Sequence, residues 1–174
     1  MPDVVAISGT PSATSKSRRL AEYALARFAA AGASIGLVDV SELPADGLLG
    51  RSRPQEIVDA LRRVLAADVI VASTPVYRAS YSGLLKVFFD LLPQEALAGK
   101  IGVPIVTGAS PGHQLAVDHA VRPLFASVGG IVVANAVYAT DAEFGPDGPA
   151  EPVLRRVDRA VDEALALSSS SSRR

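Results

Sequence analysis

Hydroxyl side chains and one lysine crowd a short segment directly behind the apolar run of residues 4–7. The hydroxyls belong to Ser8, Thr10, Ser12, Thr14, Ser15 and Ser17, and the cation is Lys16. A helical pattern begins close behind them, near Leu20. The first amides of a helix lack intrahelical acceptors and carry the positive end of its dipole, so a phosphate group binds there readily. The segment therefore predicts a phosphate site, with an ordinary hydroxyl-capped helix start as the alternative.

Two later loops carry residues suited to a flat ligand. The loop at 74–77 offers a rigid proline, backbone amides and an aromatic ring through Pro75, Val76 and Tyr77. The loop at 107–113 offers one imidazole and small residues that let a ligand approach the backbone closely. Its candidate residues are Thr107, Gly108, Ala109, Ser110 and His113. A planar heteroaromatic ring with a phosphate tail would touch all three loops, and FMN has that shape. The alternatives for the two later loops are a turn whose tyrosine covers the sheet edge and a helix-capping turn.

These loops are positioned by a regular alternation of strand and helix patterns. Apolar runs predict five strands, at residues 4–8, 34–38, 69–72, 101–106 and 131–137. Helical patterns occupy 15–31, the stretch after 54, 84–92, the stretch up to 128 and the stretch after 152, with 41–53 and 73–83 as loops. Right-handed βαβ units of this kind build an α/β three-layer sandwich, a five-stranded parallel sheet with helices on both faces. Ligands bind at the carboxyl edge of such sheets, which the loops after the first, third and fourth strands reach.

Composition excludes several classes of function. The 174 residues are 49% hydrophobic and 20% charged with a net charge of -1, so the chain lacks the concentrated positive charge that a nucleic-acid partner requires. There is no cysteine for a disulfide, a thiolate metal site or a nucleophile, and two histidines are too few for a multi-histidine metal site. The sequence shows neither a secretory signal nor an apolar stretch of about 20 residues. We expect a cytoplasmic protein without a membrane partner, with one domain over residues 1–167 and a disordered low-complexity tail over 168–174.

Two helical patterns carry unusual signals. The pattern at 84–92 is apolar on nearly every face, which predicts burial against the sheet or a second subunit, and we expect a homodimer or homotetramer through this region. Pro123 lies inside a helical pattern and removes the hydrogen bond to the carbonyl of His119. A π-bulge would relieve that conflict, and such bulges often lie at functional sites. The alternative is a proline-kinked helix with a solvated His119.

Several segments resemble the NADPH-dependent FMN reductase family. The most specific is the block at 74–93, and the segments at 8–12, 15–17, 97–100, 107–110, 113–116 and 122–124 continue the match in register. The resemblance extends from the first strand to about residue 137. Within the family the sequence is most similar to the reductases that supply reduced flavin to alkanesulfonate monooxygenases.

The resemblance implies a flavodoxin-like fold and a place for each part of FMN. The positions that match the family's phosphate site are Thr10, Ser12, Ser15 and Ser17. The isoalloxazine ring would lie against Pro75, Val76 and Tyr77 on one side and against 107–110 with His113 on the other. Ala13 and Thr14 stand where the broader superfamily has a basic side chain, so Lys16 or Arg18 would supply the charge instead.

The resemblance also bears on the helix around Pro123. The sulfonate-linked relatives have a π-helix there, with a tyrosine at the position that His119 matches. His119 is therefore a candidate for a role in flavin release or oligomer contacts, and the change from tyrosine to histidine leaves that role open.

The activity that the resemblance implies is hydride transfer from NADPH or NADH to FMN, with reduced flavin passing to an FMNH2-dependent monooxygenase of sulfur metabolism. This step requires two oriented rings and no general acid or base, so no catalytic residue is assigned. Arg18, Arg19 and Arg78 are candidates for the 2′-phosphate of NADPH, each with a solvated surface charge as the alternative. Two other functions stay open: reduction of a quinone or azo dye with tightly bound FMN, and electron transfer by a non-enzymatic flavodoxin-like module.

Overall fold

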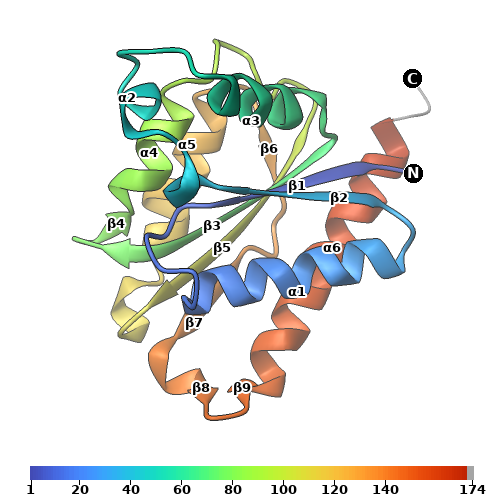
Figure 1. The fold of residues 1–174 in the computed structure, drawn as a ribbon. Helices are drawn as coiled ribbons and strands as arrows, with labels where there is room; N and C mark the ends of the chain where they lie inside the picture. The colour runs from blue at the N-terminus through green and yellow to red at the C-terminus, as the bar shows by residue number, and fades with distance from the viewer. Residues whose placement is uncertain (172–174) are drawn as a thin grey trace.

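The central sheet is built from the apolar runs of the sequence, and the computed structural model describes residues 1–171 (Figure 1). β1 (Asp3–Ser8) pairs with β2 (Ser34–Asp39) on one side and with β3 (Val69–Tyr77) on the other, and β5 (Ile101–Gly108) follows β3. All of these pairs are parallel, and every residue of β5 is buried, as expected of a strand with helices on both faces. The strand order β2-β1-β3-β5-β6, in which β6 is the short strand Ile131–Val132, confirms the predicted α/β class.

The fifth position of the sheet differs from the predicted strand at 131–137. It holds two short strands, β6 (Ile131–Val132) and β7 (Val137–Thr140), which both pair in parallel with β5. Between them the backbone leaves the ladder, because the amides of Ala134 and Asn135 donate to the carboxylate of Glu163, at 2.7 and 2.9 Å. Six strands therefore occupy the five parallel positions, and the antiparallel β4 (Ser80–Tyr81) beside β3 brings the sheet to seven strands.

The predicted loop at 73–83 is largely a hairpin. β3 continues through Tyr77 and turns back into β4 (Ser80–Tyr81), with which it pairs antiparallel. The two turn residues, Arg78 and Ala79, have φ angles of 52° and 66°. Two left-handed residues are what a tight two-residue hairpin turn requires, and glycine usually supplies them. No glycine marks the turn here, so the residue pattern did not indicate it.

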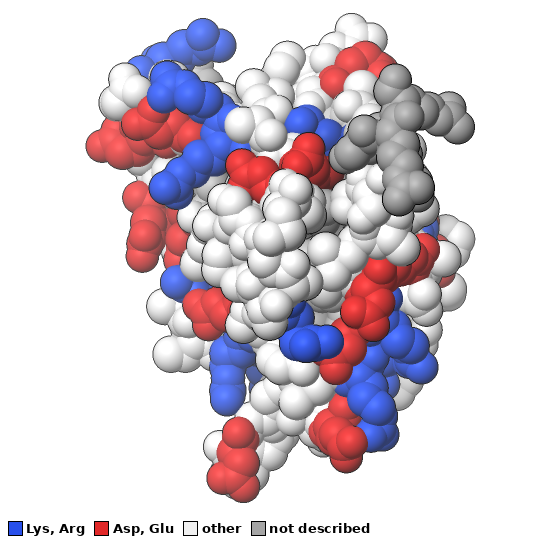
Figure 2. All heavy atoms as spheres, turned by 90° about the vertical axis from the view of Figure 1, so that its right-hand side faces the viewer, with Lys and Arg blue, Asp and Glu red and all other residues white. Residues whose placement is uncertain are grey.

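Helices cover both faces of the sheet (Figure 1). α1 (Lys16–Ala30) and α6 (Glu151–Ser171) pack on one face, around a core that includes Leu20 and Phe28. α3 (Gln55–Ala66), α4 (Gly83–Phe89) and α5 (Arg122–Ala126) pack on the other, around Phe88 and Phe125. Basic and acidic side chains lie interspersed with neutral ones on the face that Figure 2 shows, which agrees with the small net charge of the chain.

Several predicted boundaries were wrong. The segment at 41–53 is not all loop, since it contains the short helix α2 (Ala45–Leu48). α4 ends at Phe89 rather than 92, because the proline at 93 disfavours helical backbone before it and the chain continues in tighter turns. β8 (Phe144–Gly145) and β9 (Gly148–Pro149) form a small antiparallel hairpin between the fifth sheet position and α6, where no strand was predicted. α6 continues through Ser171, so the start of the predicted disordered tail is helical, and residues 172–174 lie outside the described residues.

The helix around Pro123 has the predicted wide turn. A π-helix spans Val117–Val121 and passes directly into α5. Pro123 thus lies directly after the widened turn, which accommodates the proline ring and its missing N–H within a continuous helix. Within residues 1–171, no helix combines the length and apolar character needed to cross a membrane.

Candidate functional site

The sheet register brings the three predicted loops to one edge. Ser8 at the end of β1 lies opposite Ser73 in β3, and Pro75 in β3 lies opposite Thr107 in β5. The first two loops are also bonded to each other, since the amide of Gly9 donates to the Ser73 carbonyl at 2.8 Å. The carboxyl ends of β1, β3, β5 and β7 therefore form a continuous rim (Figure 1).

The first loop presents hydrogen-bond donors at the start of α1. Ser15 caps the helix, its hydroxyl accepting from the amide of Arg18 at 3.2 Å. The hydroxyls are paired, Ser12 with Thr14 and Ser15 with Ser17, each pair at 3.2 Å. The amides of residues 13 and 14 donate to no acceptor within residues 1–171. The two free amides, together with the paired hydroxyls, lie beside the positive end of a helix dipole, and such a site is suited to an anion.

Two buried hydroxyls lie at the base of this loop. Thr10 is 2% exposed and Ser8 is fully buried. The Ser8 hydroxyl has no hydrogen-bond partner among the described residues. A buried unpaired hydroxyl costs about 1–3 kcal/mol, which a bound polar group or water can recover. The loop thus fits the phosphate end of FMN.

The cations of α1 do not all face the loop. The Nζ atom of Lys16 lies 2.8 Å from an Asp141 carboxylate oxygen, beyond the end of β7. Arg18 forms ion pairs with Asp39 and with Glu22, and its side chain is only 16% exposed. The hydrogen bond to Glu22 raises the pKa of Arg18 despite the opposing effect of burial. The interpretation of Arg18 as a solvated surface charge was therefore wrong, and this residue is held within the protein.

The second loop is fixed at its base and open at its tip. The Thr74 hydroxyl is buried and accepts from the amide of Ser82 at 2.9 Å. Pro75 and Val76 are half-buried, and Tyr77 is 49% exposed. The base is rigid while an aromatic ring stands at the rim, which suits a flat ligand.

Ser82 connects the first two loops, a role that the residue pattern did not predict. Its hydroxyl caps α4 by accepting from the amide of Leu85 at 3.1 Å, and it donates to the carbonyl of Gly9. A serine directly before a helical pattern is a recognisable cap signal. Its second bond, across 73 residues of chain, has no local signal.

The third loop is supported by Tyr138, a second residue whose role the residue pattern did not predict. The Tyr138 hydroxyl donates to the carbonyl of Ser110 at 2.6 Å. Gly108 packs so closely that a Cβ there would lie 2.4 Å from the same hydroxyl. Burial, followed by the charges of Asp141 and Glu143, raises the pKa of Tyr138, so the phenol stays protonated and donating at neutral pH. Tyr138 thus holds the backbone of this loop in place.

The candidates of the third loop range from buried at its start to exposed at its end. Thr107 and Gly108 are buried, Ser110 is half-buried, and Ala109 is exposed. His113 is exposed at the end of a short 3-10 turn, Pro111–His113. The loop therefore offers backbone and one imidazole on its outer side.

The other cationic candidates and His119 are exposed. Arg19 and Arg78 form no ion pair among residues 1–171. His119 lies on the π-helix, which packs beside β4 rather than within the three loops. The His119 side chain is exposed and forms no hydrogen bond or ion pair among residues 1–171.

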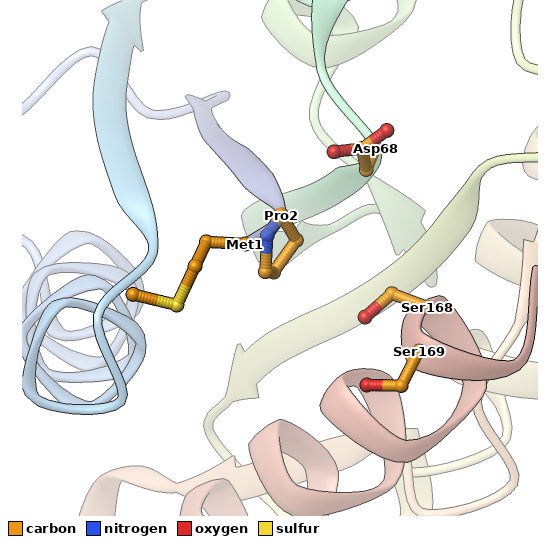
Figure 3. A pocket seen from close by; sticks show the side chains of 5 residues that line it. All are labelled: Met1, Pro2, Asp68, Ser168 and Ser169. Atoms are coloured by element: carbon orange, nitrogen blue, oxygen red, sulfur yellow. The ribbon is translucent and has the colours of Figure 1, made fainter. Parts of the chain in front are cut away.

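Two pockets help to delimit the site. One of about 110 Å³ lies at the opposite, amino edge of the sheet, lined by Met1, Pro2, Asp68, Ser168 and Ser169 (Figure 3). It is separate from the three loops. Another, of about 320 Å³, adjoins the third loop and includes Tyr138, Glu143 and Arg156. Within the described chain no group of three or more acidic or histidine side chains is placed to hold a metal ion.

Comparison with known proteins points to one family. The model of the family described as NADPH-dependent FMN reductase matches residues 2–144. An FMN reductase (NADPH) of Pseudomonas putida is 38% identical over 163 residues, which cover 93% of this chain and 82% of that protein. The NADH-dependent FMN reductase SfnE of Pseudomonas putida is 35% identical over 170 residues, covering 95% of this chain and 91% of that protein.

A solved structure shares the architecture. The apo form of the NADH:FMN oxidoreductase EMOB superimposes with a TM-score of 0.88 at 37% identity. The superposition covers 98% of this chain and 90% of that one. The similarity therefore includes the sheet, both helical layers and the rim at which the three loops meet.

Proposed function

The chain belongs to the NADPH-dependent FMN reductase family, and from this premise we propose that it transfers a hydride from a nicotinamide nucleotide to FMN held by the three loops. The observation that carries the proposal is the convergence of a donor-rich helix start, an aromatic hairpin and a small-residue loop on one sheet edge. Relatives include reductases named for NADPH and for NADH, so either nucleotide is a substrate candidate.

The first loop would bind the flavin phosphate. Thr10, Ser12, Ser15 and Ser17 would contribute hydroxyls, and the amides of residues 13 and 14 are free to donate. These groups hold a phosphate without a buried charge, because a phosphate accepts several hydrogen bonds at once. Lys16 would add a positive charge when it turns toward the loop.

The second and third loops would bind the isoalloxazine ring. Pro75, Val76 and Tyr77 would form one wall, and 107–110 with His113 the other. FMN supplies the hydride-accepting ring chemistry when it is bound. The chain contributes orientation: the rigid base at Thr74 and the Tyr138 support of the third loop hold both walls in place, which converts an encounter of two rings into a positioned contact.

We also propose that reduced FMN leaves the protein and serves an FMNH2-dependent monooxygenase of the sulfonate type, as the resemblance in sequence implies.

We further propose that the protein forms a homodimer or homotetramer through α4. Leu85, Phe88 and Phe89 of this helix are buried in the protein's own core, while Leu84 and Val87 are only partly covered. Light scattering coupled to size exclusion at micromolar concentration tests it, and a monomer would contradict it.

The proposed reaction is tested by oxidation of NADPH and NADH with and without FMN, FAD and riboflavin. We expect oxidation that FMN stimulates with at least one nucleotide. If added flavin left the rate of oxidation of both NADPH and NADH unchanged, the proposal would be refuted. A protein that stays yellow through exhaustive dialysis would instead support a tightly held flavin and a separate final acceptor.

A further inference from the structure

The single lysine of the phosphate loop is engaged elsewhere. Lys16 begins α1 between Ser15 and Ser17, yet its Nζ atom donates to the carboxylate of Asp141 at 2.8 Å. It also lies 3.5 Å from the Asp141 carbonyl and 5.4 Å from the centroid of the Phe144 ring. A cation within about 6 Å of an aromatic face is attracted to it. Three contacts from the segment after β7 therefore hold the ammonium group.

The ion pair between Lys16 and Asp141 is solvent-exposed and therefore weak. The side chains of Lys16 and Asp141 are 38% and 54% exposed. Exposed ion pairs of this kind are worth about 0–1 kcal/mol, since solvent and salt screen them. A phosphate monoester carries about two negative charges and forms stronger charge-assisted contacts than one carboxylate does. Flavin phosphate at the start of α1 can therefore compete with Asp141 for the lysine.

We propose that Asp141 sets the affinity for FMN by competing with the flavin phosphate for Lys16. The inference rests on the proposed function, and it makes Asp141 a specificity-determining residue that does not touch the ring. Each binding event must break the Lys16–Asp141 pair, and each release restores it. This competition weakens the binding of FMN without affecting the binding of a flavin that lacks the phosphate. It therefore favours FMN as a released product over FMN as a tightly bound cofactor.

The test is flavin affinity in Asp141→Asn, measured by quenching of flavin fluorescence for FMN and for riboflavin. We expect the Kd for FMN to fall about two- to fivefold, the fold-change that corresponds to a surface ion pair, and the Kd for riboflavin to stay unchanged. Asp59→Asn is the matched control. Asp59 is similarly exposed and pairs with Arg62 on α3, so its replacement changes net charge by the same amount away from the loop. An equal gain in FMN affinity in both variants would overturn the proposal.

A double-mutant cycle separates competition from simple repulsion between Asp141 and the phosphate. Lys16→Met removes the shared cation, so Asp141→Asn in that background should no longer tighten FMN. A gain that persists in Lys16→Met would show that Asp141 acts on the phosphate directly, and would overturn the proposal. Melting temperatures verify that each variant is folded, which is expected because both side chains are at the surface.

The outcomes distinguish this inference from the function beneath it. If the wild-type protein bound neither flavin and oxidised neither nucleotide in response to flavin, the proposed function would fail first. If FMN bound and was reduced while Asp141→Asn left its Kd unchanged, only the role of Asp141 would be refuted.

Discussion

The close approach of Gly108 to Tyr138 gives a prediction that tests how the third loop is held. In Gly108→Ala, the new Cβ would lie 2.4 Å from the Tyr138 hydroxyl, 3.3 Å from the carbon that bears it and 3.4 Å from a methyl group of Val76. Only the first distance is impossible, so the hydroxyl or the loop must move. Overpacking of this kind costs about 1–3 kcal/mol of the free energy of unfolding.

Tyr138→Phe removes the atom that causes the clash. It also removes the 2.6 Å hydrogen bond to the Ser110 carbonyl. That carbonyl still accepts from the amide of His113 at 3.2 Å, so it does not become fully unsatisfied. We therefore expect Tyr138→Phe to cost about 0.5–1.5 kcal/mol, the range for a net hydrogen bond.

The double variant should cost less than the sum of the two single variants. With phenylalanine at position 138, the nearest contact of the Cβ added at position 108 is the 3.3 Å one, which a shift of a few tenths of an ångström relieves. We expect a coupling free energy of about 1–2 kcal/mol from the clash that is no longer present. Urea unfolding followed by circular dichroism measures each corner of the cycle, and an FMN titration shows whether the loop still binds.

Gly83→Ala is the control for this cycle. A Cβ at position 83 meets nothing within 4 Å, and the residue begins α4. This variant should be neutral or slightly stabilising, and its effect should add to that of Tyr138→Phe. If Gly108→Ala and Tyr138→Phe were also additive within about 0.5 kcal/mol, the proposed contact between Gly108 and the hydroxyl would be refuted.

Three further predictions address the other loops and the interrupted strand. Ser82→Ala should lower the free energy of unfolding by about 1–2 kcal/mol, because it removes the cap of α4 and the bond to Gly9; a loss below about 0.5 kcal/mol in urea unfolding would contradict the double role. Tyr77→Ala should raise the Kd for FMN and for riboflavin alike, by about two- to tenfold, since the ring rather than the phosphate loses a contact; a change confined to FMN would refute that placement. Burial opposes ionisation of Glu163, but the bonds from Asn135 and its neighbour prevail and lower the pKa of this carboxyl. The folded-state pKa of Glu163 lies below the unfolded value of about 4.3. The ionised carboxylate therefore stabilises the fold fully above that pH, and this stabilisation is lost as pH falls through the folded pKa. Glu163→Gln should therefore flatten the decline of the melting temperature below about pH 4.3, and a parallel decline would argue against the role of the carboxylate.

Much of this protein follows from local pattern. The alternation of apolar runs and helical periods determined the α/β class, because each period depends only on which side of an element is buried. The order of strands then brought the first, second and third loops to one edge. Ser15 as a helix cap and a π-helix before Pro123 were likewise predictable, since both depend on residues within one helical turn.

What the sequence left undecided is which distant groups meet. Lys16 turns to Asp141, which lies 125 positions away in the sequence, and Tyr138 holds the Ser110 carbonyl from an adjacent strand. The predicted fifth strand breaks because Glu163 of α6 takes its amides. Residues distant in sequence decide where a side chain points, which charges pair and where a strand ends. Only the folded sheet brings these residues into contact. The local sequence therefore determined at which sheet edge a flavin site could form, and the tertiary structure decided which side chains lie at that edge and which are paired elsewhere.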